Sequence, residues 1–513
     1  MKMQFIFAFT LIFHPFISML AQPIVEWQKC LGGAGSDVGV MILPVNRSYI
    51  GLGSTNSLSG NVSGNHGDID IWVFKLDSAG SLLWQKCLGG SGLDFGSAIA
   101  PTTDGGFIVI GSTASNDGDV SGSHGNDDVW FVKLNSAGEI DWQKCLGGSG
   151  KDIGWSIFPS ANGGYFATGR TDSNDGDVSG NHGSSDCWVV KLDSTGILEW
   201  QKCLGGSGID NSYFIVPGTD GGCVTVGVSS SGDGDVIGYH GAADCWVVKL
   251  SSSGSIQWQK PLGGSGADMG WSITAGADGG YVVAGTTQSN DGDVNGNHGL
   301  NDVLLIKLSA DGLVQWQQCF GGALDDKGYS VATTPDGGYV LAGNTQSNNG
   351  DVSGNHGASD CWAVKLNSVG EIQWQKCLGG SADESGLSIR PTPDGGYALV
   401  GQSKSNDGDV SGNHGDADVW VVKLAADLTG LPSDSKKKHV DIFPNPASNT
   451  ILVKTKDACL GKKYHLINSL GSVVLSGKIL MPEMRLSIDH LPAGIYSFRL
   501  EGELAQDIRL VKD

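Results

Sequence analysis

The sequence predicts an all-β protein, a seven-bladed β-propeller of four-stranded blades followed by a small β-sandwich. The chain of 513 residues has 81 Gly and only 17% charged positions, which disfavours helices and favours short strands joined by tight turns. A Trp-Gln dipeptide recurs first after 57 residues and then five times after 58, so one supersecondary unit is repeated. The seven tryptophans are Trp27, Trp84, Trp142, Trp200, Trp258, Trp316 and Trp374.

Each repeat contains four candidate strands separated by Gly-containing turns. In the repeat that begins near Gly270 the apolar runs are 270–273, 280–285, 302–308 and 314–318, with Asp-Gly turn signals between them. Four antiparallel strands in each of seven units are what a closed propeller requires, because radial stacking covers both faces of every sheet.

The two ends of the repeat region complement each other. The chain enters with a lone fourth strand at 25–30 and leaves after a third strand at 419–424. We therefore expect the N-terminal strand to complete the seventh blade, which removes an exposed sheet edge. The alternative is an open β-solenoid, but a solenoid needs capping repeats of different composition.

Both ends of the chain differ from the repeats. Residues 1–21 carry one early lysine and then an apolar run, which is typical of a secretory signal peptide, so the propeller is predicted over 22–424. No other stretch is long enough to span a bilayer. The polar, basic segment 425–439 predicts a linker, and the alternating strands of 440–513 predict the β-sandwich.

Two resemblances follow from these motifs. The repeat Trp-Gln-Lys-Cys-Leu-Gly-Gly-Ser-Gly, with Asp-Gly-Gly-Tyr and Asp-x-Trp-Val-Val-Lys-Leu, resembles the bacterial β-propeller repeat family of secreted proteins over about residues 24–424. That family implies fold and export but no particular activity. Val440-Asp-Ile-Phe-Pro-Asn-Pro, Leu491-Pro-Ala-Gly-Ile-Tyr and the terminal strand resemble the type A sorting domain of the type IX secretion system. This second resemblance implies the type IX machinery as a partner and a secreted or cell-surface location, at the exterior of the outer membrane.

Charge limits the classes of partner. The chain has 32 Lys and Arg against 54 Asp and Glu, a formal charge of -22, which disfavours nucleic acid and anionic lipid. The charge leaves calcium and neutral sugar partners open, and an extracellular glycan or protein is the expected binding partner. We expect a monomer.

Acidic loops between the second and third strands are candidate calcium sites. Asp residues at i and i+2 around a Gly offer oxygen ligands, although the full EF-hand spacing is absent. The alternative is that they form Asx-turns with their own backbone. A His in each loop is expected to bond the Asp four residues on. The candidate calcium ligands are Asp117, Asp119, Asp175, Asp177, Asp291, Asp293, Asp407 and Asp409.

The chain has 11 cysteines, an odd number. Simple hairpin counting places Cys187 opposite Cys203 and Cys361 opposite Cys377, so each pair is a candidate cross-strand disulfide. A third pair, Cys223 with Cys245, is less well placed. The alternative is that the cysteines are small buried hydrophobic residues.

One variable repeat position carries aromatic residues on four successive blades, namely Trp155, Tyr213, Trp271 and Tyr329. Near the innermost strands these side chains predict an arc for stacking on sugar rings. The alternative is that they share the face of Ile157 and fill the space between sheets.

No catalytic motif is present: the sequence lacks His-Glu-x-x-His, Cys-x-x-Cys, Gly-x-Ser-x-Gly and a phosphate loop. Nearly every polar residue is copied around the ring, so a non-enzymatic protein is expected. The exceptions Lys151, Lys327, Glu384 and Arg390 are interpreted as surface charges. The predicted function is an exported binding or adhesion module for glycan or protein. The alternatives are a propeller-based polysaccharide hydrolase or lyase, or a passive scaffold stabilised by calcium.

Overall fold

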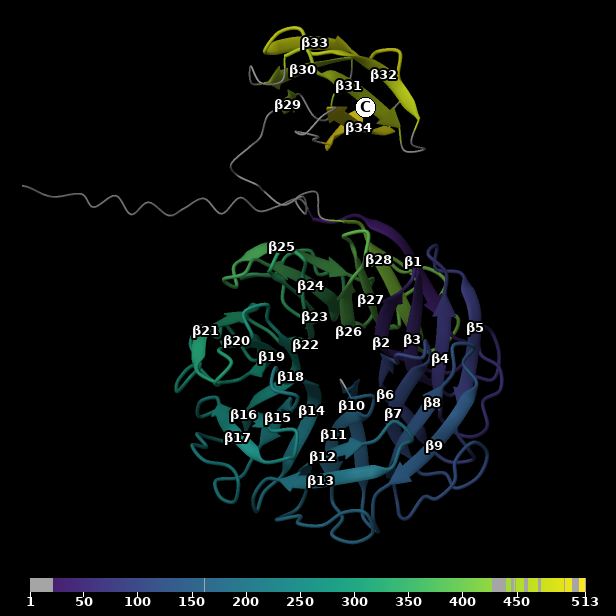
Figure 1. Cartoon of the computed structure of the whole chain (residues 1–513), viewed down its shortest axis with the longest axis vertical. Helices are drawn as coiled ribbons and strands as arrows, with labels where there is room; N and C mark the ends of the chain where they lie inside the picture. The colour runs from purple at the N-terminus through teal and green to yellow at the C-terminus, as the bar shows by residue number, and fades with distance from the viewer. Residues whose placement is uncertain are drawn as a thin grey trace, which may run out of the picture. The chain divides into compact units, whose positions relative to one another are not determined.

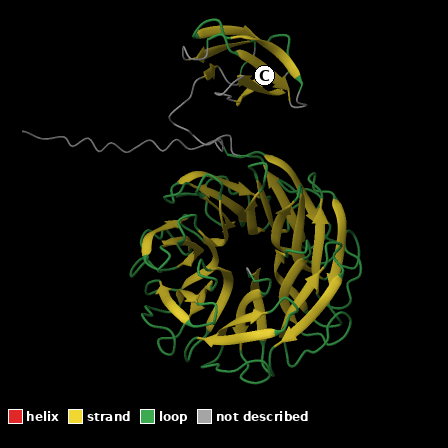
Figure 2. Cartoon of the chain, in the orientation of Figure 1, coloured by secondary structure: helices red, strands yellow, loops and turns green. Residues whose placement is uncertain are grey.

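The computed structural model describes residues 22–160, 162–426, 440–443, 447, 449–455, 460–468, 472–492, 494–500 and 507–512. The predicted signal peptide and all of the predicted linker except residues 425 and 426 lie outside these ranges. The chain divides into two compact units, Met1–Gly430 and Leu431–Asp513. The described residues form strands and loops without a helix (Figure 2). Within this part of the chain, no helix has the length and apolar character needed to cross a membrane.

The first unit contains seven four-stranded antiparallel sheets arranged as a ring, which confirms the predicted seven-bladed propeller (Figure 1). The first strands of the blades are β2 (Asp37–Val45), β6 (Asp94–Pro101), β10 (Asp152–Pro159), β14 (Asp210–Pro217), β18 (Asp268–Ala275), β22 (Asp326–Thr333) and β26 (Glu384–Pro391). The second strands are β3 (Ser48–Thr55), β7 (Phe107–Thr113), β11 (Tyr165–Thr171), β15 (Cys223–Ser229), β19 (Tyr281–Thr287), β23 (Tyr339–Thr345) and β27 (Tyr397–Ser403). The third strands are β4 (Asp70–Leu76), β8 (Asp128–Leu134), β12 (Asp186–Leu192), β16 (Asp244–Leu250), β20 (Asp302–Leu308), β24 (Asp360–Leu366) and β28 (Asp418–Leu424). The fourth strands are β5 (Leu82–Leu88), β9 (Ile140–Leu146), β13 (Leu198–Leu204), β17 (Ile256–Leu262), β21 (Val314–Phe320), β25 (Ile372–Leu378) and, from the N-terminus, β1 (Val25–Leu31).

The N-terminal strand closes the ring as predicted. Strand β1 pairs antiparallel with β28, and Cys30 lies opposite Trp420 in this pairing. The backbone N–H of Ala425 then donates to the carbonyl of Ile24 at 2.9 Å. The last blade therefore has its outer strand, and the described ends of the propeller are held together by a sheet ladder.

Apolar cores fill the spaces between neighbouring blades. Each of seven buried clusters combines side chains from two adjacent sheets, and the cluster between the seventh and first blades contains Val421 and Trp72. The third strands are buried on both faces, which explains why they read as continuous apolar runs. The first strands lie nearest the ring axis, and each contacts the first strand of the next blade (Figure 1).

The second unit is a two-sheet sandwich, as predicted. One sheet contains β29 (Val440–Phe443), β30 (Thr450–Thr455) and β33 (Glu483–Ser487). The other contains β31 (Lys463–Asn468), β32 (Val473–Lys478), β34 (Gly494–Leu500) and β35 (Asp507–Lys512). Its core includes Ile451, Val453 and Phe498, and the rings of Tyr464 and Phe498 stack with centroids 5.2 Å apart.

The predicted pairing of Cys187 with Cys203 is wrong, because the register of the two strands differs by one residue from the prediction. In the β12–β13 hairpin, Leu192 pairs with Leu198, and a bulge then shifts the register. Cys187 therefore lies opposite Leu204, and Cys203 lies opposite Trp188. A shift of one residue moves a side chain to the other face of the sheet.

The equivalent bulge separates the second candidate pair, and the third pair is separated along a regular ladder. Cys361 lies opposite Leu378, and Cys377 lies opposite Trp362. Cys223 and Cys245 lie near opposite ends of the β15–β16 ladder. The ten cysteines of the described residues are buried and free, as the alternative interpretation expects. Burial raises the pKa of the Cys203 thiol to about 12, so this thiol is unreactive at neutral pH.

Candidate functional site

A β-bulge occurs at the same position of the first strand in all seven blades. The pairing of the first and second strands skips one residue after the position of Gly154. A bulge leaves one residue unpaired and redirects its side chain. The bulge residues are Val40, Ser97, Trp155, Tyr213, Trp271, Tyr329 and Leu387. The variable position found in the sequence is thus the bulge position on the strands nearest the ring axis.

The four aromatic bulge residues, which we call the aromatic arc, contact one another from blade to blade. The ring centroids of Trp155 and Tyr213 lie 4.8 Å apart in an edge-on arrangement. Tyr213 and Trp271 stack at 4.5 Å, and Trp271 meets Tyr329 edge-on at 6.0 Å. The structure therefore brings all four predicted residues together in one continuous row across β10, β14, β18 and β22.

The arc lies outside the cores between the blades. Ile157 is buried in the core between the second and third blades, whereas none of the four arc residues belongs to any core cluster. All four arc side chains are only half-buried. The alternative that these rings share the face of Ile157 is wrong, because the bulge at Trp155 interrupts the alternation of side chains along β10.

Polar partners orient two of the arc residues. The Asn211 side-chain amide donates to the Tyr213 hydroxyl at 3.3 Å, and the Trp271 indole N–H donates to Thr286 Oγ1 at 3.2 Å. Burial raises the pKa values of Tyr213 and Tyr329, so both hydroxyls remain neutral at physiological pH. The arc thus combines apolar ring surface with neutral hydroxyl groups.

Two arginines that the sequence analysis did not place at the site bond to or pair with residues next to arc positions. Arg390 Nη1 donates to Ser330 Oγ at 3.0 Å and to the Ile389 carbonyl at 2.8 Å. Its interpretation as a surface charge is wrong, since the side chain is half-buried and burial lowers its pKa to about 10. Arg170 lies close enough to Tyr213 to lower the pKa of its hydroxyl partly. The sequence contained one signal for both residues: Arg170 and Arg390 each replace a residue that is uncharged in the other repeats.

The predicted calcium ligands bind backbone N–H groups. Asp117 Oδ1 accepts from the Ser91 N–H at 2.7 Å, and Asp175, Asp291 and Asp407 make the same bond to the connection that enters their blade. The second residues of the pairs accept more weakly: Asp119, Asp177 and Asp409 lie 3.4 Å from a glycine nitrogen, and Asp293 lies 3.9 Å from His240.

These contacts differ from the Asx-turn alternative, because the bonded N–H groups belong to another segment of the chain. Among the described residues, no group of three or more His, Cys, Asp or Glu side chains is arranged to hold a metal ion. Calcium binding by the acidic loops is untested and stays a prediction.

Buried carboxylates at the starts of the first and third strands hold the loops of their own blades. Asp94 accepts bonds from Thr113, from Ser115 at 2.8 Å and from the Gly90 N–H at 2.8 Å. Asp70, on the preceding blade, accepts from the ring and backbone nitrogens of His66 at 2.7 and 2.9 Å. The predicted bond between each loop His and the Asp four residues on is therefore confirmed.

The third-strand carboxylates share an unusual feature. The Oδ1 atom of Asp70 is buried and has no hydrogen-bond partner in the described residues, and burial raises the pKa of this group. The same holds for Asp128, Asp186, Asp244, Asp302, Asp360 and Asp418. This sevenfold set was not found from the sequence, because the pattern does not show which Asp becomes buried.

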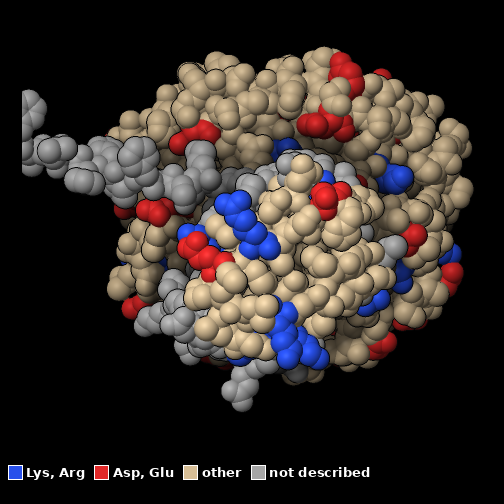
Figure 3. Space-filling model, turned by 90° about the horizontal axis from the view of Figure 1, so that it is seen from above, with Lys and Arg blue, Asp and Glu red and all other residues tan. Residues whose placement is uncertain are grey.

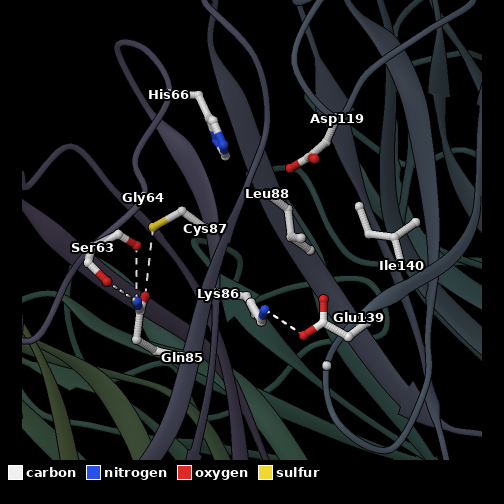
Figure 4. Close-up of a pocket in the computed structure, with 11 residues that line it drawn as sticks. Ser63, Gly64, His66, Gln85, Lys86, Cys87, Leu88, Asp119, Glu139 and Ile140 are labelled. Atoms are coloured by element: carbon white, nitrogen blue, oxygen red, sulfur yellow. Dashed lines mark hydrogen bonds and ion pairs between the residues drawn. The ribbon is translucent and has the colours of Figure 1, made fainter.

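A pocket of about 380 Å³ lies at the outer edge between the first and second blades (Figure 4). Its polar groups pair with one another: Lys86 forms an ion pair with Glu139 at 2.7 Å, and Gln85 donates to Ser63. Charged side chains elsewhere on the face drawn in Figure 3 lie singly or in small groups. The aromatic arc, and not the pocket or these charged groups, is therefore the candidate binding site.

Comparison with known families identifies the C-terminal unit. Residues 441–511 match the secretion system C-terminal sorting domain. The protein is therefore a β-propeller cargo of the type IX secretion system, and it is secreted or attached to the cell surface.

One curated relative of the chain is distant in sequence. The chain is 24% identical over 242 residues to the regulatory protein FlaEY of Caulobacter vibrioides, covering 44% of this chain and 25% of that protein. It thus spans about a quarter of that relative's length.

Solved structures that resemble the chain share little sequence with it. One is the extracellular domain of the putative one component system BT4673 from B. thetaiotaomicron, with 11% identity, a TM-score of 0.39, and coverage of 95% of this chain and 58% of that one. Another is PorZ, a surface component of the type IX secretion system of Porphyromonas gingivalis, with 10% identity, a TM-score of 0.34, and coverage of 92% and 69%. Such values carry no argument about function.

Proposed function

We propose that the propeller is a carbohydrate-binding module and that the aromatic arc is its binding surface. The observation that carries this proposal is that four aromatic side chains lie outside every core, half-exposed, in one continuous row. Large rings that contribute nothing to a core are costly to leave in contact with water, and sugar rings present flat C–H faces that pack on aromatic side chains. A ligand in contact with the row covers this apolar surface.

The shape of the row favours an extended ligand over a single sugar. Trp155 and Tyr329 lie at its two ends on different blades, and the two contacts between them pass through Tyr213 and Trp271. The ring faces of Tyr213 and Trp271 that stack on each other are mutually covered. A chain of several sugar units would contact the remaining faces and edges together, which raises affinity through many modest contacts.

We also propose that the bound carbohydrate is not chemically altered. A general acid or base must reach the reacting group, and the carboxylates on the arc-bearing strands are fully buried. Asp152 at the start of β10 is engaged by Thr171, Ser173 and the Gly148 N–H. Incubation with a bound polysaccharide is expected to leave its chain length and reducing ends unchanged, and release of shorter products would contradict this part of the proposal.

Binding of the purified protein to a panel of polysaccharides tests the proposal. Trp271→Ala is expected to weaken the binding of any positive polysaccharide at least tenfold, which corresponds to about 1.4 kcal/mol. Trp316→Ala is the matched control, because Trp316 is a half-buried indole on the fourth strand β21, packed against a core. Binding that is lost equally in both variants, or no binding to any polysaccharide, would overturn the proposal.

A further inference from the structure

The arginines of the propeller are unevenly distributed. Residues 22–424 contain only three, Arg47, Arg170 and Arg390. Arg47 is exposed in the β2–β3 turn. Arg170 pairs with Ile153, two residues before Trp155, and Arg390 donates to Ser330, the residue after Tyr329. In a chain with a formal charge of -22, two of the three arginines of the propeller thus bond to or pair with residues next to the two ends of the arc.

Arg390 lies at the Tyr329 end of the arc. It projects from β26 of the seventh blade and donates across the blade interface to Ser330, the residue that follows Tyr329 on β22. Only its Nη1 atom makes hydrogen bonds within the described residues. Its Nε and Nη2 groups thus keep donors available for a ligand.

No carboxylate balances Arg390. No acidic side chain of the described residues forms an ion pair with it, and burial is the sole cause of its lowered pKa. The lysines of the third strands contrast with it in six of the seven blades, where each has an acidic partner, whereas Lys75 of the first blade forms no ion pair within the described residues. The pairs are Lys133–Asp104, Lys191–Glu199, Lys249–Asp220, Lys307–Asp278, Lys365–Asp336 and Lys423–Asp394. Arg390 thus differs from six of the seven third-strand lysines in forming no ion pair.

Arg170, near the other end of the arc, has only a distant acidic partner. Its Nε atom lies 3.9 Å from Asp172 Oδ1 and is buried without a hydrogen-bond partner. It projects from β11, where it pairs with Ile153 in the neighbouring β10 ladder, two residues before Trp155. A desolvated guanidinium without a full set of acceptors is costly unless a ligand supplies them.

We infer that the aromatic arc binds an acidic carbohydrate and that Arg390 receives a carboxylate of one of its sugar units. This inference rests on the proposed function and adds the class of ligand. A planar guanidinium matches a carboxylate with two parallel hydrogen bonds, while the rings of the arc pack against the faces of neighbouring sugar units. Arg170 is the second cationic group for a chain that carries a carboxylate on each unit.

Because the protein is strongly acidic overall, a preference for an acidic carbohydrate would identify a specific cationic site. A protein with a net charge of -22 repels a polyanion in the absence of a specific cationic site. Unspecific electrostatic attraction therefore cannot produce tighter binding to the acidic member of a matched pair of carbohydrates. Tighter binding to that member needs local cations that no acidic side chain already pairs.

Calorimetric titration with oligogalacturonate and with its fully methyl-esterified form tests the inference, because esterification removes the carboxylate charge. The purified protein is expected to bind the acidic form at least tenfold more tightly. Arg390→Met keeps an apolar stem and is expected to abolish that preference, and Arg390→Lys is expected to restore part of it by keeping the charge without the fork. Arg47→Met removes an arginine at an exposed turn and is expected to change nothing.

The outcomes separate the two proposals. Equal affinity for both forms, with binding still lost in Trp271→Ala, would overturn the acidic preference and leave carbohydrate binding standing. Binding of neither these oligosaccharides nor any polysaccharide of the panel would overturn both. A preference for the acidic form that Arg47→Met removes as strongly as Arg390→Met would also overturn the assignment to Arg390. If Arg390→Met does not fold, the Arg390→Lys variant carries the same comparison.

Discussion

The indole N–H of Trp420 donates a hydrogen bond to Oε1 of Gln28 at 2.8 Å, although 392 residues separate the two in sequence. The same bond joins the third and fourth strands inside a continuous blade, where Trp72 donates to Gln85 at 2.8 Å. The Gln28 amide also donates to Ser411. The blade assembled from both ends of the repeat region thus has the same side-chain chemistry as the others.

The Gln28→Leu variant is expected to lower the free energy of unfolding by about 1–3 kcal/mol, because the buried indole N–H of Trp420 loses its acceptor. Gln143→Leu removes the equivalent bond from Trp130 within the second blade and serves as the control. Both variants are expected to be destabilised, but only Gln28→Leu should speed hydrogen exchange in β1 and β28. Equal exchange in the two variants would contradict a special role of this bond in closure.

Asp94→Ala is expected to destabilise the propeller strongly. The substitution leaves the hydroxyls of Thr113 and Ser115 and the N–H of Gly90 without their acceptor in a buried site, at a cost of about 3 kcal/mol or more. Asp119→Ala removes a half-exposed carboxylate with one long contact of 3.4 Å and is expected to change stability by less than about 0.5 kcal/mol. Denaturant unfolding of both variants measures the difference, and equal effects would contradict the assigned roles.

Stability is expected to rise as the pH is lowered toward the pKa values of the buried third-strand carboxyl groups. Burial raises the pKa values of groups such as Asp70 and Asp186 above their usual range. A raised pKa in the folded state favours the protonated form there, so the stability it contributes is complete below the unfolded pKa and is lost as pH rises through the folded pKa.

At lower pH, carboxyl groups with lowered pKa values dominate the change in stability. Hydrogen bonds hold the pKa values of Asp104 and Asp278 below the usual value, so their contribution is present above about pH 3.8 and is lost as pH falls through the folded pKa. Melting temperature is therefore expected to pass through a maximum in mildly acidic solution. Asp186→Asn should flatten the acidic rise, and an unaltered profile in that variant would contradict the assignment.

Removal of divalent cations separates the two interpretations of the acidic loops: calcium sites predict a lower melting temperature, and loops held by backbone N–H groups predict an unchanged one. The oxygen atoms of Asp117 and Asp175 are already occupied by backbone N–H groups, and the described residues hold no cluster of three metal-binding side chains. Calorimetric melts with EDTA and with added calcium measure this. A fall of several degrees in EDTA that calcium restores would instead support calcium binding by the acidic loops.

The seven repeats, the closure of the ring by the N-terminal strand and the C-terminal sandwich could be predicted. Each of them leaves a recognisable pattern of residues in the sequence. Two of the failures, the disulfide pairing and the face of the arc, have one physical cause. A bulge inserts a single residue without changing the composition of a strand, as between Lys191 and Leu192, and this moved Cys203 from Cys187 to Trp188. The bulge at Trp155 likewise separated the arc from the face of Ile157.

Arg390 was misplaced for a different reason. Its depth depends on packing across two blades, and Ser330, which receives its hydrogen bond, lies 60 residues away in sequence. A single repeat therefore contains no sign that this side chain is half-buried beside the arc. The orphaned Asp oxygen atoms were missed for the same reason, since burial is a property of the assembled ring.

The bulge residue and the core residue beside it are under different evolutionary constraints. Substitution of a core residue such as Ile157 disturbs packing with the neighbouring sheet, whereas the bulge residue beside it belongs to no core. Seven such positions surround the axis, and here they carry residues as different as Ser97, Leu387 and Trp271 on the same scaffold. Homologous rings can therefore diverge in what they recognise by exchanging a few residues, while the framework that folds and is exported stays constant.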